Sequence, residues 1–276
     1  MNISLRKLAL SSKKNLMKYF LTYSLYSLFL FIRELIKVPI SRASRHRLSA
    51  VYQTLRYPYF GDRLNDLSVL LTKSNLQVVV PGVKTEAHNA DSFEMLAICS
   101  LLKDSEASQV FEIGTYNGRT TRAMAMNISG TDPKVYTLNL PPDTQTVDLP
   151  TSDVDVQLSA KVISGECFLG TAEAELITQL WGDSATYHFE PFFGKMDFIF
   201  IDGAHSKEYV ARDTENALKM IKPSGGIIAW HDAHLFGVVQ FLEPWISMNR
   251  LDVRFIKNTS LAVGRVRNGE IIQWKL

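Results

Sequence analysis

The spacing of apolar positions changes near residue 91, and from there two kinds of segment alternate along the chain. Short runs of consecutive apolar residues favour buried strands, whereas segments with apolar residues three or four positions apart favour helices. The expected strands cover residues 109–113, 134–140, 195–201 and 226–230, with another directly before Gly182, and the expected helices cover residues 92–102, 119–127 and 206–221. Buried strands that alternate with helices predict an α/β fold in which helices cover both faces of a parallel sheet.

The last two apolar runs, residues 251–256 and 261–266, are joined by only a few residues. A crossover between parallel strands needs roughly a dozen residues or more, so this short connection predicts an antiparallel hairpin. We therefore expect a Rossmann-like sheet that is mostly parallel and has an antiparallel last strand.

Residues 1–72 differ from the rest of the chain in charge, and we expect them to form a helical arm. Eleven Lys and Arg residues fall within residues 1–60, where Glu34 is the only acid. These residues carry a net charge of +10 within an overall +2, which leaves −8 for the remainder. Such asymmetry indicates that the arm meets an anionic surface, either phospholipid or nucleic acid.

The uncharged segment of residues 19–32 limits how the arm could meet a membrane. As a helix it would be about 21 Å long, which is shorter than the hydrocarbon core of about 30 Å. An interfacial helix on the membrane surface is therefore the first interpretation. Packing against the body or a second subunit, a cleaved signal peptide and a true span are the alternatives.

The overall composition is that of a globular protein, with 276 residues of which 46% are apolar and 21% charged. These fractions argue against a disordered chain and a multi-span membrane protein, and they favour one large domain with an appendage. Cys99 and Cys167 are far apart and lack partners at metal-site spacing, so neither a disulfide scaffold nor a structural zinc site is expected. We expect a reducing, cytoplasmic location, with the arm as a peripheral membrane contact.

Polar residues follow the expected strands at the place where a parallel sheet binds its ligands, the carboxyl ends of the strands. Four acids and two histidines gather there: Glu112, Asp183, Asp202, Asp232, His205 and His231. Gly114 and Gly118 let the backbone come close to a ligand, but their GxxxG spacing differs from the GxGxxG of dinucleotide sites. A small, positively charged ligand suits this set better than a pyrophosphate does.

The segment VFEIGTYNGRTT, residues 110–121, resembles motif I of the class I S-adenosylmethionine (SAM)-dependent methyltransferases. GDSAT, DFIFIDGAHSKEYVARD and GGIIAWHD are similar to later motifs of their small-molecule O-methyltransferase branch. The resemblance covers residues 86–267 and is nearest to the macrocin-type (methyltransferase 24-like) group. It implies a seven-stranded sheet within a methyltransferase domain of residues 73–276, preceded by the arm of residues 1–72.

The resemblance also implies contacts to the cofactor. Asn139 stands where the family usually has an acid that holds both ribose hydroxyls, and an amide lacks the charge-assisted strength of a carboxylate. The resemblance surrounds the methionine part of SAM with Glu112, Gly114, Tyr116, Gly118 and Thr120, flanks the adenine edge with Asp183 and Ser184, and places Asp202 near the cofactor.

Asp202 and Asp232 match the acids that bind a divalent cation in metal-dependent relatives. Mg²⁺ is the first choice, but His231 stands where relatives often carry another acid. Because imidazole is a poor Mg²⁺ ligand, Mn²⁺ and no metal at all are alternatives. The catalytic residues implied are Asp202 and a base, His205 or His231, that removes the acceptor proton. A competing interpretation makes Asp202 a cap of the helix that follows it.

The resemblance implies an enzyme that methylates a hydroxyl of a small molecule, with a sugar or glycosylated metabolite ahead of a phenol. Nucleic-acid amino-methyltransferases typically have Asn or Asp, Pro-Pro and an aromatic residue after the fourth strand, and the sequence after residue 201 lacks this motif. We therefore do not expect a nucleic-acid partner. The alternative is a catalytically silent SAM-binding protein or membrane-attached scaffold. Whether the chain forms a homo-oligomer is left open by the sequence.

Overall fold

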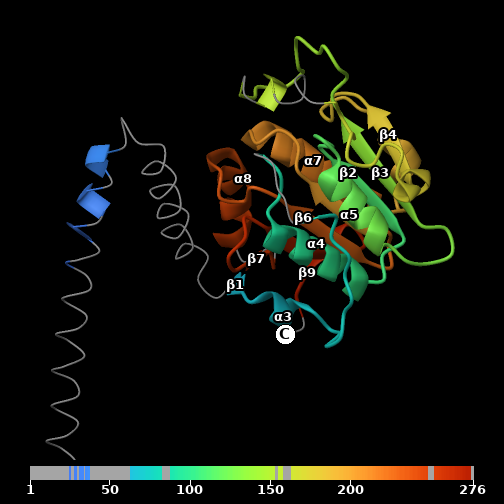
Figure 1. The fold of residues 1–276 in the computed structure, drawn as a ribbon, viewed down its shortest axis with the longest axis horizontal. Helices are drawn as coiled ribbons and strands as arrows, with labels where there is room; N and C mark the ends of the chain where they lie inside the picture. The colour runs from blue at the N-terminus through green and yellow to red at the C-terminus, as the bar shows by residue number, and fades with distance from the viewer. Residues whose placement is uncertain are drawn as a thin grey trace, which may run out of the picture. The chain divides into compact units, whose positions relative to one another are not determined.

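The computed structural model describes residues 63–82, 88–152, 155–157, 163–247 and 252–274, together with scattered helical residues between 25 and 37 (Figure 1). The chain divides into two compact units, residues 1–59 and 60–276. Most of the predicted arm, including residues 38–62, lies outside the described residues. The sheet and the cavity belong to the second unit.

The second unit is built on a sheet that has nine strands among the described residues, in the order β1-β7-β8-β6-β5-β2-β3-β4, with β9 paired to β8. The strands are β1 (Leu64–Asn65), β2 (Gln109–Ile113), β3 (Lys134–Asn139), β4 (Ile177–Trp181), β5 (Phe198–Ile201), β6 (Gly226–Trp230), β7 (Arg254–Ile256), β8 (Ala262–Arg267) and β9 (Glu270–Ile272). β8 runs antiparallel to β6 and β7, whereas the pairs that join β4, β3, β2, β5 and β6 are parallel. The predicted α/β fold with a mostly parallel sheet and a terminal antiparallel hairpin is confirmed.

The strand count differs from the predicted seven because two short strands join the sheet. Strands β2 to β8 are the seven expected ones. β1 pairs parallel with β7, and β9 pairs antiparallel with β8. Segments of two or three residues carry no hydrophobic pattern of their own, so only the neighbouring strand defines them. Because β1 precedes residue 73, the sheet includes part of the segment that we assigned to the arm.

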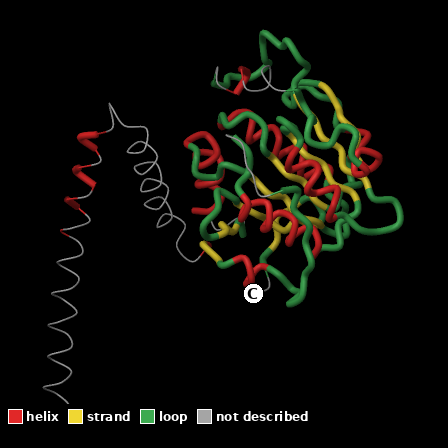
Figure 2. Tube along the Cα trace, in the orientation of Figure 1, coloured by secondary structure: helices red, strands yellow, loops and turns green. Residues whose placement is uncertain are grey.

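Helices cover both faces of the sheet, which explains why its central strands are apolar throughout (Figure 2). The helices are α3 (Leu67–Leu70), α4 (Ser92–Asp104), α5 (Arg119–Asn127), α7 (Lys207–Met220) and α8 (Phe236–Ser247). Phe111 and Ile199 share one hydrophobic cluster with residues of α7 and α8. Val110 and Phe198 share another with residues of α3, α4 and α5. Successive strand residues therefore point to opposite faces, and both faces are buried.

Two of the helices begin at polar caps. The Asp91 side chain accepts hydrogen bonds at the start of α4, including one from the Glu94 N–H, and the Glu94 side chain accepts from the Asp91 N–H. At the start of α7, the Ser206 side chain accepts from the Tyr209 N–H. Ser206 rather than Asp202 caps α7, so the capping interpretation of Asp202 is wrong.

β5 begins at Phe198 rather than at residue 195 because the preceding backbone bonds elsewhere. The N–H groups of Lys195 and Met196 donate to the Met220 oxygen, and Met196 forms an isolated bridge with Ile221. These contacts connect the start of the strand to the end of α7, a tertiary feature that local hydrophobicity does not encode.

Candidate functional site

A cavity of about 170 Å³ opens at the carboxyl ends of strands β2 to β6. Residues that follow each of these parallel strands line it, as the topology of an open parallel sheet predicts. The predicted site residues in its wall are Gly114, Tyr116, Asn139, Asp183, Ser184, Asp202, His205 and Asp232. The structure therefore brings most of the predicted set together around one space.

The loop after β2 packs closely against the end of β5. Gly114 has a φ of +101°, and a Cβ at this position would lie 2.1 Å from the backbone oxygen of Asp202. The Gly114 N–H donates to the Leu138 oxygen at 2.8 Å. Glycine is required at position 114 because both the backbone conformation and the close approach exclude a side chain. This contact sets the distance between two walls of the cavity.

Some predicted site residues do not line the cavity, namely Glu112, Gly118, Thr120 and His231. Glu112 is buried in β2, where its Oε2 accepts hydrogen bonds from the hydroxyls of Thr121 and Thr137. Gly118 is the N-terminal cap of α5, and Thr120 lies in the first turn of that helix. Their positions indicate that these three residues hold the loop after β2 in shape.

Replacing Glu112 with Gln is expected to change how stability depends on pH. Burial raises the pKa of Glu112 from 4.5 to about 8, although Thr121 and Thr137 donate to it. The folded chain therefore holds a proton that the unfolded chain loses above pH 4.5, so this group's stabilising contribution decreases as the pH rises to about 8. The slope is at most about 1.4 kcal/mol per pH unit.

Because glutamine does not titrate, the free energy of unfolding of the Glu112→Gln variant should decrease less than that of the wild type between pH 5 and pH 8. Urea unfolding of both proteins at several pH values measures this difference. Parallel stability curves would show that Glu112 is ionised in the folded state.

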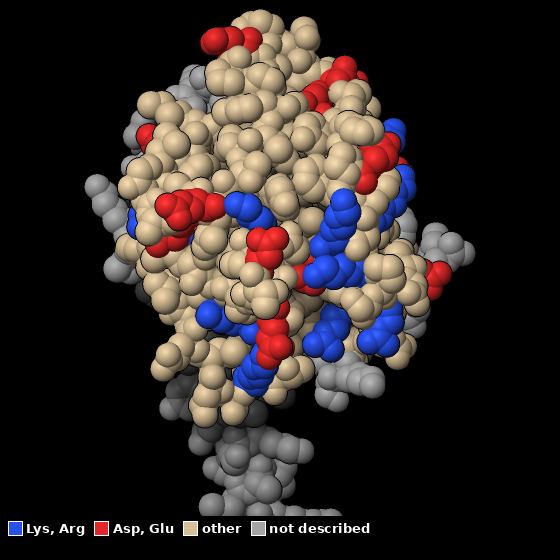
Figure 3. Space-filling view, turned by 90° about the vertical axis from the view of Figure 1, so that its right-hand side faces the viewer, with Lys and Arg blue, Asp and Glu red and all other residues tan. Residues whose placement is uncertain are grey.

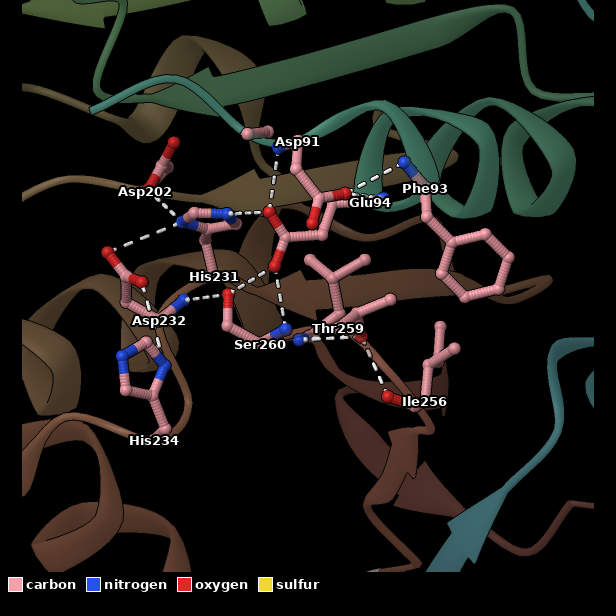
Figure 4. Close-up of polar contacts among 12 residues, drawn as sticks. Asp91, Phe93, Glu94, Asp202, His231, Asp232, His234, Ile256, Thr259 and Ser260 are labelled. Atoms are coloured by element: carbon pink, nitrogen blue, oxygen red, sulfur yellow. Dashed lines mark hydrogen bonds and ion pairs between the residues drawn. The ribbon is translucent and has the colours of Figure 1, made fainter. Parts of the chain in front are cut away.

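His231 lies behind the cavity wall, where acidic side chains surround its ring (Figure 4). Its Nδ1 is 2.9 Å from Asp202 Oδ1 and 3.5 Å from Asp232 Oδ2. Its Nε2 is 3.2 Å from Glu94 Oε2. One potential metal-ligating atom from each of Asp202, His231 and Asp232 lies within 4.8 Å of the other two. The arrangement can hold positive charge, carried either by the imidazole or by a divalent cation.

The charges in this cluster shift pKa values in opposite directions. Burial lowers the pKa of His231, but the carboxylates of Asp202 and Asp232 outweigh it and raise that pKa well above its ordinary value. Burial raises the pKa of Asp232, but His231 and His205 hold it well below its ordinary value. Asp232 also has a left-handed φ of +48°. A strained backbone and shifted pKa values at one residue are typical of functional sites.

His205 faces the cavity between two carboxylates. Its Nδ1 lies 3.0 Å from Asp155 Oδ1, and its Nε2 lies 3.2 Å from Asp232 Oδ2. The backbone N–H of His205 also donates to Asp155 Oδ2. Burial lowers the pKa of His205, but the hydrogen bonds to Asp155 and Asp232 raise it to about 10. Asp155 therefore orients the ring so that Nε2 points toward Asp232.

Asp183 is held by hydrogen bonds from several parts of the chain. Its carboxylate accepts from the Tyr209 hydroxyl at 2.8 and 2.9 Å and from the N–H groups of Asp148 and Ala185. The Thr186 hydroxyl donates to Asp148 Oδ2 at 2.7 Å. These bonds connect the loop after β3 to the loop after β4.

Glu94, Asp155 and Tyr209 contribute to the site, although the sequence pattern does not predict them as site residues. Glu94 belongs to the capping box that starts at Asp91, a pattern that locates a helix start but not the contact with His231. Asp155 falls in a polar segment without strand or helix periodicity. These contacts join elements far apart in the sequence, so local patterns could not reveal them.

Residues 111–233 match a family described as a methyltransferase domain. The matched segment runs from β2 through the loop after β6 and includes the residues that follow all five cavity-forming strands. This match covers somewhat less than half of the chain, and it supports the resemblance to the class I, SAM-dependent methyltransferases and the expectation of an enzyme. A search of curated proteins finds no match.

Several solved methyltransferases are similar in structure. An O-methyltransferase from Bacillus cereus in complex with SAH is 18% identical, with a TM-score of 0.46, covering 68% of this chain and 84% of that chain. TomG from Streptomyces achromogenes, an O-methyltransferase of tomaymycin synthesis solved with SAM, is 18% identical, with a TM-score of 0.45 and coverages of 68% and 82%. SAH-bound PaMTH1 from Podospora anserina is 15% identical, with a TM-score of 0.45 and coverages of 65% and 80%.

Proposed function

We propose that this methyltransferase transfers the methyl group of SAM to a hydroxyl of a small molecule, with a sugar or glycosylated metabolite as the first candidate acceptor. The observation that carries the proposal is the cluster of Asp202, His205 and Asp232 in the cavity wall, within the segment that matches the methyltransferase family. Carboxylates and a histidine beside a methyl donor can take up the proton that a hydroxyl releases. The choice of a sugar derives from the sequence resemblance alone.

The cavity wall supplies contacts for SAM in this proposal. Gly114 and Tyr116 would lie along the methionine part, Asn139 beside the ribose, and Asp183 with Ser184 beside the adenine. Asn139 offers an amide where a carboxylate would give stronger, charge-assisted hydrogen bonds. We therefore expect the glycine loop and the adenine side of the cavity to supply much of the affinity.

The reaction is a displacement in which the acceptor oxygen attacks the methyl carbon. The new C–O bond forms as the C–S bond breaks, the sulfur keeps the bonding electron pair, and S-adenosylhomocysteine leaves. The hydroxyl proton passes to Nε2 of His205 in its neutral form, which becomes more populated as the pH rises toward 10 and which Asp232 Oδ2 faces at 3.2 Å. Of the two candidate bases, His205 lines the cavity. His231 would instead act through Asp202 and Asp232, and alignment of the acceptor contributes much of the acceleration.

The donor set at Asp202 and Asp232 fits a divalent cation. His231 is 9% exposed, and its Nδ1 faces both carboxylates, 2.9 Å from Asp202 Oδ1 and 3.5 Å from Asp232 Oδ2. Two carboxylates and the imidazole nitrogen that faces them are suitable ligands for Mn²⁺, and the carboxylates alone would suit Mg²⁺. When bound, the cation would lower the pKa of the acceptor hydroxyl.

A transfer assay tests the proposed function. The full chain is incubated with methyl-labelled SAM, Mn²⁺ or Mg²⁺, and a panel of simple glycosides, glycosylated metabolites, catechol and amines. Label transferred to a glycoside hydroxyl supports the proposal, and transfer to catechol alone keeps O-methylation but contradicts the sugar acceptor. Transfer to amines alone contradicts O-methylation. SAM binding without transfer to any acceptor would favour the silent SAM-binding alternative.

A nucleic-acid acceptor is not part of the proposal. The sequence after residue 201 lacks the motif of the nucleic-acid amino-methyltransferases, and the face of the second unit in Figure 3 carries Asp and Glu side chains among its Lys and Arg side chains.

We propose further that the basic arm attaches the enzyme to an anionic lipid surface. Helical side chains between residues 25 and 37 include exposed apolar ones, such as Phe29 at 61% and Ile36 at 73% exposure. Among the described residues, no helix is long and apolar enough to cross a membrane. Apolar side chains near an excess of ten positive charges suit the interface of an anionic bilayer.

Replacing Phe29 and Ile36 with Asp is expected to weaken binding to vesicles of phosphatidylcholine and phosphatidylserine by more than about tenfold, because each apolar side chain contributes roughly 1.5–3 kcal/mol when buried. Co-sedimentation with vesicles measures this. Leu169→Asp, at an exposed apolar position of the second unit, is the matched control and should bind like the wild type. Equal vesicle binding by all three proteins would contradict membrane attachment through the arm.

A further inference from the structure

Glu94 makes more contacts than its role in starting α4 requires. Its Oε2 accepts from the Asp91 N–H at 2.9 Å, which completes the capping box. The same oxygen lies 3.2 Å from His231 Nε2, and Oε1 accepts from the N–H and hydroxyl of Ser260, both at 2.7 Å. A helix cap needs only the first of these contacts. The remaining contacts connect α4 to the residues behind the cavity.

Both branches from Glu94 lead to Asp232 (Figure 4). In one branch, His231 lies between Glu94 and the carboxylates of Asp202 and Asp232. In the other, the Ser260 hydroxyl accepts from the Asp232 N–H at 3.3 Å, at the residue whose φ is +48°. Glu94 thereby supports the ring of His231 and the strained turn that presents Asp232.

The orientation of the His231 ring follows from this contact. A carboxylate has no proton to donate in its ionised form, so the hydrogen bond between Glu94 and Nε2 places the proton on Nε2. Nδ1 is then the nitrogen that faces Asp202 and Asp232, at 2.9 and 3.5 Å, and a cation held by the two carboxylates would replace any proton on it. A carboxylate behind a histidine in this way is typical of metal-ligating imidazoles.

We propose that Glu94 is a positioning residue that makes His231 a ligand, so that the site of Asp202, His231 and Asp232 prefers a transition-metal cation such as Mn²⁺ to Mg²⁺. This inference rests on the cation site of the proposed function. The preference follows because imidazole nitrogen binds Mn²⁺ and later transition metals well, whereas Mg²⁺ prefers oxygen ligands and keeps several waters. Without the contact to Glu94, the ring of His231 could turn or carry its proton on Nδ1. The carboxylates of Asp202 and Asp232 would then be the ligands that remain.

Glu94→Gln is the variant that tests the inference, because it keeps size and shape. Both oxygens of the Glu94 carboxylate accept hydrogen bonds from N–H groups. Whichever oxygen the glutamine NH₂ replaces, that NH₂ would therefore face another hydrogen-bond donor. With its NH₂ toward His231, the glutamine would favour the tautomer with the proton on Nδ1, which cannot ligate. Asp91→Ala is the matched control, since it removes the other half of the same cap without touching His231.

Calorimetric titration of the full chain and both variants with Mn²⁺ and, separately, Mg²⁺ gives the readout, with SAM affinity and melting temperature recorded alongside. The wild type should bind Mn²⁺ more tightly than Mg²⁺. Glu94→Gln should lose about 10- to 100-fold in Mn²⁺ affinity with little change for Mg²⁺. Asp91→Ala should lose stability, by about 1 kcal/mol, and keep the Mn²⁺ preference.

Other outcomes overturn the inference in distinguishable ways. Unchanged Mn²⁺ affinity in Glu94→Gln would leave the cation site standing and exclude a role of Glu94 in it. An equal loss in Asp91→Ala would show that α4 merely packs against the site. A wild type that binds SAM but not Mn²⁺ would overturn both the inference and the cation site, while methyl transfer itself would stay supported.

Discussion

Replacing Asp202 with Ala is expected to reduce methyl transfer by at least about 100-fold, a loss typical of removing a group that handles a proton or a charge in the transition state. Asp202 lines the cavity directly after β5, and its carboxylate lies 2.9 Å from His231 Nδ1. The substitution removes both an acid of the cavity wall and one of the proposed cation ligands. Asp232 stays near the imidazole at 3.5 Å, so we expect the domain to remain folded.

Formation of S-adenosylhomocysteine, with any hydroxyl acceptor that the wild type uses, measures the loss. Asp197→Ala is the matched control, because Asp197 precedes the same strand and pairs with Lys222 at the opposite end of the sheet. The control should be less stable but should transfer methyl groups at the wild-type rate per folded molecule. A turnover of Asp202→Ala close to that of the wild type would remove Asp202 from the mechanism.

Replacing Gly114 with Ala is expected to destabilise the domain by about 3 kcal/mol or more, because a positive φ and an overpacked contact each cost roughly 1–3 kcal/mol. The φ of Gly114 is +101°, and the added Cβ would lie 2.1 Å from the Asp202 oxygen and 2.9 Å from the Gly203 nitrogen. These neighbours are backbone atoms that cannot rotate away. The loop after β2 would therefore have to move, and the SAM affinity should decrease with it.

Gly170→Ala separates the two causes of this loss. Gly170 also has a positive φ, +72°, but a Cβ there would meet nothing within 4 Å. This control should show only the conformational cost, about 1 kcal/mol, and should bind SAM like the wild type. Chemical unfolding and SAM titration of both variants provide the measurements. An equal effect of the two substitutions would mean that the contact between Gly114 and Asp202 does not hold the loop.

Much of the sheet could be predicted from the sequence because its central strands are buried on both faces. The run from Gln109 to Ile113 and the run from Gly226 to Trp230 are strands with the bounds expected from hydrophobicity alone. The short strands β1 and β9 could not be predicted, because two or three residues show no periodicity and depend on β7 and β8 for pairing. The local hydrophobic pattern therefore predicts strands that are buried on both faces. It does not predict short strands that form only because a neighbouring strand pairs with them.

The site likewise contains residues that the sequence predicts and residues that it does not. Asp202 and Asp232 follow parallel strands directly, and the topology of the sheet places such residues at a common end. Glu94 reaches His231 from a helix more than a hundred residues earlier in the chain, and Asp155 reaches His205 from a polar segment without helix or strand periodicity in the sequence. Contacts of this kind depend on how helices and loops pack on the sheet, which the spacing of residues does not specify.

Calorimetric titration of the full-length chain with SAM tests the central claim most directly. An affinity on the order of micromolar, about −8 kcal/mol, is expected despite Asn139, and Gly114→Ala should weaken it. A chain that is folded by circular dichroism and binds no SAM, with or without Mn²⁺, would contradict the assignment of the cavity as the cofactor site of a methyltransferase.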